Sequence, residues 1–210
     1  MKEDILEQLV DDYLQAKGYF TQHNLKFKPR KGCVGYNAPQ DRVPSDIDVI
    51  GINPRLQPPD NVWAVGCKSW QDGFWVRQML DAIDHNKKVG GKEGWRHFRE
   101  LSRDKWAAAF MDAVEAAAGT RRFTYVTAVT LLCGGDSAKE AWTSRTDFSR
   151  RLEGNPIIIL SLAEMLEDVF PKLGTTVASS QFSRSLQLIK ASGWQMKIVK
   201  KPKPRSLTMR

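Results

Sequence analysis

The spacing of apolar and polar residues predicts a helix and three strands in the first third of the chain. Apolar residues recur at helical spacing over residues 3–17, so we expect an amphipathic helix there. Apolar and polar residues alternate over 20–29, which predicts a strand, whereas 30–44 is rich in Gly, Pro, Lys and Arg and predicts a loop. Two short runs rich in β-branched residues, 46–53 and 62–70, predict two further strands joined by a proline-rich turn.

The rest of the chain predicts helices interleaved with two more strands. The expected elements are helices over 75–88 and 95–118, a strand over 123–133, a helix over 137–152, a strand over 156–160 and helices over 161–170 and 180–192. The first strands are joined by short links, and a helical crossover precedes the later ones. This order predicts an α/β fold in which helices flank both faces of a mixed central sheet.

Composition is typical of a globular protein that works in a reducing compartment. Hydrophobic residues make up 41% of the chain, and no apolar run approaches the roughly 20 residues that a membrane span requires. The charged N-terminus leads into an amphipathic helix, so we expect no secretory signal. Cys33, Cys67 and Cys133 are widely spaced and form neither a disulfide framework nor a zinc pattern. We therefore expect a cytoplasmic protein that does not contact a membrane.

Positive charge is concentrated at the C-terminal end of the chain. Residues 197–210 contain six Lys and Arg and no acid, so they contribute +6 of the net charge of +8. Nucleic acid is one explanation of this basic segment, and a solvated flexible end is the other. We expect residues 1–135 to form the core, residues 136–196 to form an α/β extension packed on it, and residues 197–210 to form a basic flexible tail.

Charged residues stand at the ends of two neighbouring predicted strands. Asp46 and Asp48 open the strand over 46–53, and Lys68 lies near the end of the strand over 62–70. Burying a lysine and carboxylates in this way costs free energy unless the charges are paired or bind a cation. This placement suggests a metal-dependent site that cleaves phosphodiesters.

The segments Ser45–Gly51 and Val65–Trp70 resemble the PD-(D/E)XK nuclease superfamily, in which one strand delivers an aspartate and the next delivers Glu-x-Lys or Gln-x-Lys. The resemblance covers residues 3–133. It implies a restriction-endonuclease-like core of a helix, three strands, helices and a strand. It also implies a DNA endonuclease that depends on Mg²⁺ or Mn²⁺, in the setting of restriction or mobile-element defence.

The resemblance assigns roles to individual residues. Asp48 matches the metal-binding aspartate and Lys68 the catalytic lysine, while Cys67 would lend its backbone carbonyl to the metal with its thiol facing away. Gln71, three residues past the lysine, would touch the attacking water or the phosphate. Gly66 departs from the family, because it stands where Glu or Gln is expected and glycine has no side chain to bind metal.

Three interpretations of Gly66 remain open. Another acid replaces the missing ligand: Glu7 matches a helix glutamate seen in parts of the superfamily, and Asp46 shares a strand face with Asp48. Alternatively the site binds metal weakly. In the third interpretation the chain is a catalytically inactive nuclease-fold module that binds nucleic acid or acts as a scaffold. A thiol-dependent enzyme at Cys67 is a further class, which would be indifferent to chelators.

Basic residues after the second motif predict contacts with the phosphates of DNA, with RNA as an alternative. The candidates are Lys87, Lys88, Lys92 and Arg96 in the body of the chain and Lys200, Lys201, Lys203 and Arg205 in the tail. The histidines show no ligand spacing, and we expect His85 and His97 on helix surfaces. Cleavage of both strands favours a homodimer or a partner subunit, because one site cuts one strand.

Overall fold

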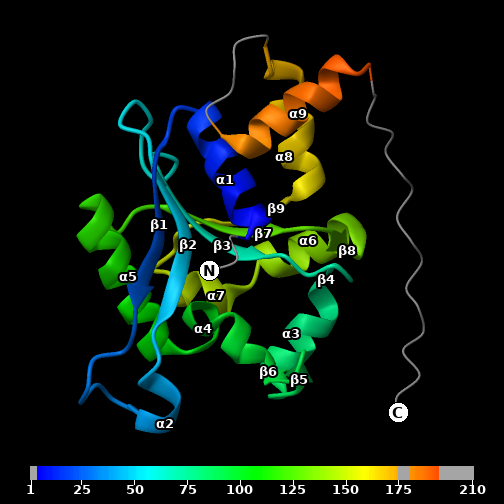
Figure 1. Ribbon diagram of the computed structural model, residues 1–210. Helices are drawn as coiled ribbons and strands as arrows, with labels where there is room; N and C mark the ends of the chain where they lie inside the picture. Colours follow the sequence, from blue (N-terminus) through cyan, green and yellow to red (C-terminus); the bar gives the residue numbers. More distant parts are fainter. Residues whose placement is uncertain (1–3, 175–179, 194–210) are drawn as a thin grey trace, which may run out of the picture.

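A five-stranded mixed sheet with strand order β1-β2-β3-β7-β9 lies at the centre of the protein (Figure 1). The computed structural model describes residues 4–174 and 180–193. The strands are β1 (Phe20–Phe27), β2 (Ser45–Ile52), β3 (Val62–Lys68), β7 (Thr124–Val129) and β9 (Ile157–Ser161). The first three pair antiparallel, and β3, β7 and β9 pair parallel. The predicted α/β class with a mixed central sheet is confirmed.

Helices cover both faces of this sheet, as the sequence predicts. In chain order the helical segments are α1 (Ile5–Ala16), α2 (Ala38–Asp41), α3 (Val76–Asp84), η1 (Gly94–His97), α4 (Arg99–Ser102), α5 (Asp104–Ala118), α6 (Gly135–Thr143), α7 (Thr146–Arg151), α8 (Leu162–Val169), η2 (Phe170–Lys172) and α9 (Gln181–Ala191). α1, α8 and α9 lie together on one side of the sheet, and α3 to α7 pack on the other (Figure 1). Within the described ranges, no helix is both long and apolar enough to cross a membrane.

The two faces of the sheet follow from the period-two alternation of strand side chains. On β3, Val62 and Ala64 pack into the apolar cluster beneath α5, whereas Val65 and Cys67 pack into the cluster beneath α1. All six residues of β7 are buried, as expected of a parallel strand covered on both faces. The side chains of β3 that follow Ala64 on its face are therefore directed to the side of α4 and α5.

The prediction of one helix over 95–118 is wrong. The chain forms η1, α4 and α5 in succession, because Phe98 (φ −142°, ψ 61°) and Arg103 (φ −138°, ψ 124°) leave the helical region. Phe98 is fully buried and packs against the rings of Phe74 and Trp142, with centroids 5.7 and 4.7 Å away. The apolar spacing that suggested a continuous helix marks burial of these residues, which a broken helix satisfies equally well.

Other predicted elements are also subdivided. The strand over 123–133 ends at Val129, and its last residues form β8 (Leu132–Cys133), which pairs with β4 (Phe74–Trp75) in a separate two-stranded sheet. The helix over 137–152 is divided into α6 and α7. After α3, the hairpin of β5 (Lys88–Val89) and β6 (Lys92–Glu93) turns at two glycines with positive φ.

The C-terminal part of the described chain is built into the same core. β9 pairs along β7, and the side chains of Trp142 and Phe148 are fully buried in the cluster that contains Phe98. The Trp142 indole donates a hydrogen bond to the Thr127 hydroxyl at 3.1 Å, which satisfies a polar group inside this cluster. The basic segment 197–210 lies outside the described residues.

Candidate active site

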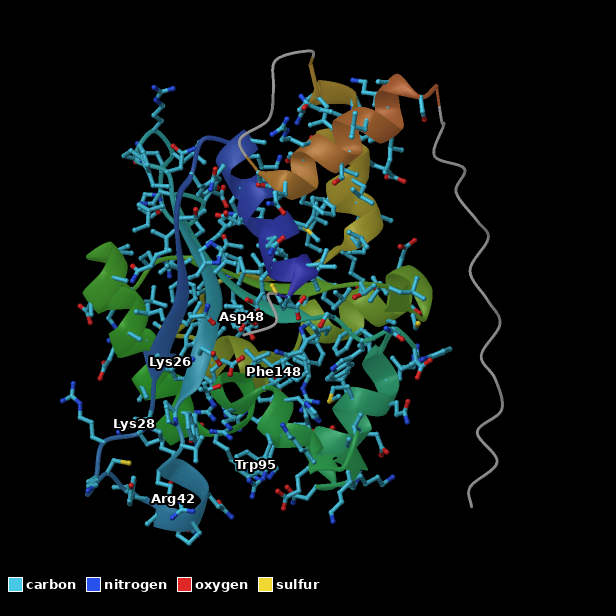
Figure 2. The ribbon with its side chains drawn as sticks, viewed as in Figure 1. Lys26, Lys28, Arg42, Asp48, Trp95 and Phe148 are labelled. Atoms are coloured by element: carbon cyan, nitrogen blue, oxygen red, sulfur yellow. The ribbon has the colours of Figure 1, made fainter. Side chains whose placement is uncertain are left out.

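The candidate site lies where β2 and β3 separate. Their pairing runs from Ile52–Val62 to Val49–Val65 and ends there, so Asp48 and Gly66 are the first residues beyond it. The Cys67 backbone N–H donates to Asp48 Oδ2 at 2.5 Å. The Asp48 carboxylate, and not a carbonyl group of the β2 backbone, therefore accepts the hydrogen bond from the Cys67 N–H. Figure 2 shows Asp48 near the centre of the view, below the first turn of α1.

A cavity of about 270 Å³ opens at this fork. Its walls come from the start of β2, the end of β3, the segment of η1 and α4, and Tyr125 of β7. Asp48, Lys68 and Glu100 all line it, although they lie on three separate elements. The structure thus brings together the two residues on which the sequence prediction rests and adds Glu100, a carboxylate from a third element.

Lys68 presents an ammonium group to this cavity with little to neutralise it. Its Nζ donates to the Cys67 carbonyl at 3.1 Å and lies 5.2 Å from the centroid of the Phe98 ring. Among residues 4–174 and 180–193, no carboxylate lies within ion-pair distance of this nitrogen. The positive charge is therefore available to an anion that enters the cavity.

Asp48 is a carboxylate whose surroundings oppose its ionisation. Burial raises its pKa, and the positive charge of Lys68 and the N–H of Cys67 only partly offset this effect. A carboxylate that is partly buried near other acids is stabilised when a cation binds to it. The electrostatics of Asp48 are consistent with a cation ligand.

The two acids proposed as replacements for position 66 have different surroundings. Glu7, in the first turn of α1, has its pKa raised to about 7 by burial and by the negative charges of Asp48 and two other aspartates. Asp46 is paired with Lys26 across the β1–β2 ladder at 2.6 Å. Asp46 lines the cavity, but it already has a cation partner, whereas Glu7 shares the electrostatic field of Asp48 without lining the cavity.

Cys67 and Gln71 differ from each other in their relation to the site. The Cys67 side chain packs in the apolar cluster beneath α1, and burial raises its thiol pKa well above the usual value. A thiol that stays protonated is a poor nucleophile, so the structure disfavours a thiol-dependent enzyme. Its carbonyl already accepts the Lys68 hydrogen bond. Gln71 lies exposed in the turn after β3 and does not line the cavity.

Glu100 and Tyr125 are site residues that the sequence analysis missed. Glu100 is only 8% exposed, and its Oε1 accepts a hydrogen bond of 2.5 Å from the Tyr125 hydroxyl. Burial raises the pKa of both groups. In the sequence, Glu100 stands within a basic stretch and reads as an ordinary surface acid. No spacing pattern in the sequence identifies Glu100 as a site residue. The predicted helix breaks at Phe98 and Arg103, and these breaks separate α4 from η1 and α5.

The rim of the cavity carries aromatic and basic side chains. The expectation that His97 lies on a helix surface is wrong: its ring is half-buried, contacts the Trp70 ring edge-on at 5.2 Å and lies 2.9 Å from the Val89 carbonyl. Burial lowers the pKa of His97, so the ring is neutral near pH 7. Arg96 also lines the cavity and forms an ion pair with Glu93.

The predicted nucleic-acid contacts fall on the hairpin beside the rim. Lys88 and Lys92 are exposed on β5 and β6, and Lys87 is exposed just before them but paired with Asp81 at 2.7 Å. Lys200, Lys201, Lys203 and Arg205 lie outside the described residues.

The donor set of the cavity fits a small hard cation. Within the part of the chain that the structure describes, no group of three or more His, Cys, Asp or Glu side chains is arranged to hold a metal ion. Mg²⁺ needs fewer protein ligands, because one or two carboxylates suffice when water and phosphate oxygens complete its shell. Asp48 and Glu100 provide two carboxylates in one cavity, and both have raised pKa values.

No protein-family model, curated protein or solved structure matches this chain.

Proposed function

We propose that this protein is a metal-dependent DNA endonuclease with a restriction-endonuclease-like core. The observation that carries the proposal is the meeting of Asp48 and Lys68, from two adjacent strands, in one cavity at the fork of β2 and β3. The order of helix, three antiparallel strands, helices and a parallel strand supports the same core. A buried glutamate in that cavity adds the acidic character that phosphodiester hydrolysis with a divalent cation requires.

In this proposal the carboxylates and the lysine have complementary tasks. Mg²⁺ or Mn²⁺, when bound, polarises the phosphate and lowers the pKa of a coordinated water. Asp48 would hold the ion, because its carboxylate lines the cavity and because Lys68 and the Cys67 N–H only partly offset the cost of burying its charge. The N–H of Cys67 fixes the orientation of that carboxylate.

Lys68 would act on the phosphate and the attacking water. Its ammonium group is placed by the Cys67 carbonyl and by the face of Phe98, and neither of these partners neutralises its charge. Negative charge develops on the phosphate oxygens during hydrolysis, and a preorganised cation stabilises it. Lys68 can also hold a water molecule by hydrogen bonding through its remaining N–H groups.

DNA is the substrate proposed for this site. Lys88 and Lys92 on the hairpin and Arg96 at the rim would contact backbone phosphates, which position the strand without reading its sequence. The Trp70 ring at the rim is partly exposed and offers an aromatic surface next to the cavity.

A second candidate is a nuclease-fold module that binds nucleic acid without cleaving it. The presence of Gly66 at the position of the family's Glu or Gln favours this candidate. It predicts DNA binding that is insensitive to chelators and no cleavage with any divalent metal. The same experiment distinguishes the two functions.

The test is cleavage of supercoiled and linear DNA by the purified protein with Mg²⁺, Mn²⁺ or EDTA. Asp48→Ala and Lys68→Ala should abolish cleavage and leave the thermal unfolding transition in place. Asp136→Ala is the matched control, because Asp136 is exposed on α6 away from the cavity lining. Cleavage retained in either folded site variant contradicts the proposal, and DNA binding without cleavage under every metal establishes the second candidate.

A further inference from the structure

The backbone at Gly66 directs its missing side chain into the cavity. A Cβ placed at this glycine would lie 3.5 Å from the Tyr125 hydroxyl and 4.0 Å from Lys68 Nζ. Both are ordinary van der Waals distances, so a Cβ fits here without displacing a neighbour. A longer side chain at position 66 would therefore extend toward the Tyr125 hydroxyl and the Lys68 ammonium group.

A carboxylate already occupies that region, and it comes from another element. Glu100 Oε1 lies 2.5 Å from the Tyr125 hydroxyl, the same atom toward which a Cβ at position 66 points. Lys68 and Asp48 are charged neighbours of the Glu100 carboxylate as well. A side chain at position 66 on β3 and the Glu100 side chain on α4 can therefore both reach the Tyr125 hydroxyl.

Glu100 is poorly compensated for a carboxylate at this depth. Among the described residues, no Lys, Arg or His forms an ion pair with it, and Tyr125 is its side-chain hydrogen-bond donor. A buried carboxylate in this condition costs free energy that a bound cation would offset. The Glu100 backbone N–H and the positive charge of Lys68 offset part of this cost.

The interruption of the chain around α4 places Glu100 on the cavity wall. α4 is a single turn bounded by Phe98 and Arg103, both outside the helical region. Phe98 and Leu101, on either side of Glu100, are fully buried and anchor the turn in the core. This anchoring holds the carboxylate in place without help from β3.

We propose that Glu100 is the acid that Gly66 lacks: delivered from α4, its carboxylate binds the same divalent cation as Asp48, which lines the same cavity from β2. The inference rests on the proposed nuclease function and deepens it. Tyr125 then acts as a positioning residue, because its hydroxyl holds one oxygen of Glu100 and leaves the other for the ion.

The first test measures metal affinity without DNA, using Mn²⁺ titrations followed by calorimetry and by electron paramagnetic resonance. Glu100→Gln keeps the shape and the Tyr125 contact but removes the charge, and it should weaken Mn²⁺ binding at least 10-fold. Glu140→Gln, on the exposed surface of α6, is the control and should bind as the wild type does. Thermal unfolding of each variant shows that the fold is retained.

The second test moves the carboxylate across the cavity. Glu100→Ala should lose cleavage and leave space at the Tyr125 hydroxyl. Adding Gly66→Glu in that background should recover both Mn²⁺ binding and part of the cleavage, because the new side chain at position 66 extends into the same place. Wild-type Mn²⁺ binding and cleavage in Glu100→Gln, with Asp48→Ala inactive, would overturn the role of Glu100 and leave the nuclease standing. A wild-type protein that neither binds Mn²⁺ nor cleaves DNA would overturn both.

Discussion

Two buried carboxylates in this protein, Asp41 and Glu100, have opposite surroundings. Asp41 is completely buried and accepts hydrogen bonds from Lys105 Nζ at 2.6 Å, from the Trp106 indole at 3.0 Å and from the Asn37 N–H at 2.6 Å. The pKa of Asp41 is lowered, because these donors outweigh the effect of burial. Among the residues that the structure describes, Glu100 accepts from one side-chain donor, the Tyr125 hydroxyl, and burial raises its pKa.

This difference indicates that Asp41 stabilises the fold and that Glu100 is available to bind a ligand. Asp41 joins α2 and its loop to the start of α5, and every donor it needs comes from the chain itself. Glu100 and its neighbour Lys68 face a cavity, and within the described part of the chain neither forms an ion pair. Incomplete pairing of buried titratable groups is typical of functional sites, since the missing partner is the substrate or the ion.

The largest expected effect comes from exchanging a lysine in each region. Lys68→Met should lower the rate of DNA cleavage about 10²- to 10³-fold, because it removes a preorganised positive charge from the cavity. It should leave the unfolding midpoint nearly unchanged. Lys105→Met should lower the unfolding midpoint and leave the cleavage rate nearly unchanged, since it leaves Asp41 buried without its cation. Rates from initial velocities and midpoints from urea unfolding would check both, and equal destabilisation by the two substitutions would show that Lys68 is as structural as Lys105.

Removing the carboxylates themselves should separate the regions by stability. Asp41→Ala should lower the free energy of unfolding by about 3 kcal/mol, because it leaves the Trp106 N–H without an acceptor and leaves the Lys105 ammonium with the neutral Gly35 carbonyl in place of a carboxylate. Glu100→Gln should change it by less than about 1 kcal/mol or increase it, since a costly charge is lost. Chemical denaturation in EDTA measures both. A loss at Glu100 as large as that at Asp41 would show that Glu100 is structural.

The pH dependence of stability tests a third carboxylate, Glu7, whose surroundings also oppose its ionisation. Its pKa is raised to about 7 from an ordinary value near 4.5, so the folded state favours the protonated form. Stability from this group is complete below pH 4.5 and is lost as the pH rises through 7. The melting temperature of Glu7→Gln should therefore be about 3 °C above that of the wild type at pH 8. At pH 4 the two proteins should melt at the same temperature. Melting curves in EDTA test this, and a difference that grows toward low pH would refute it.

The smallest effect concerns the salt dependence of DNA binding. Lys92 is exposed beside the cavity rim, whereas Lys105 is partly buried and paired with Asp41. Lys92→Ala should flatten the slope of log affinity against log salt concentration by about one unit, because one phosphate contact is lost. Lys105→Met, assayed where it is folded, should leave the slope unchanged. Fluorescence anisotropy over a series of salt concentrations measures both.

Local patterns were enough to predict the sheet and the residues that enter the site from it. The β-branched runs that became β2 and β3 carry Asp48 and Lys68 on the same face as the cavity, as period-two alternation requires. The capping box at Ser161 fixes the start of α8.

The far wall of the site was not predictable from spacing. Phe98 and Leu101 follow a helical period with the residues of α5, so the breaks at Phe98 and Arg103 left no trace in the pattern. Those breaks depend on packing against Phe74 and Trp142, which lie far away in the sequence. Long-range packing of this kind overrides local propensity, and Glu100 lies within the segment it controls.

The participation of β9 and Trp142 in the core sets a limit on how the protein can be shortened. A fragment that stopped at residue 135 would contain Asp48, Lys68 and Glu100, but it would lose the strand that covers the free edge of β7 and the indole that packs on Phe98. The exposed edge would invite aggregation, and the turn that carries Glu100 would lose its support. The smallest fragment suited to expression and crystallisation therefore extends through α8, because Met165 and Val169 of that helix are buried in the cluster beneath α1.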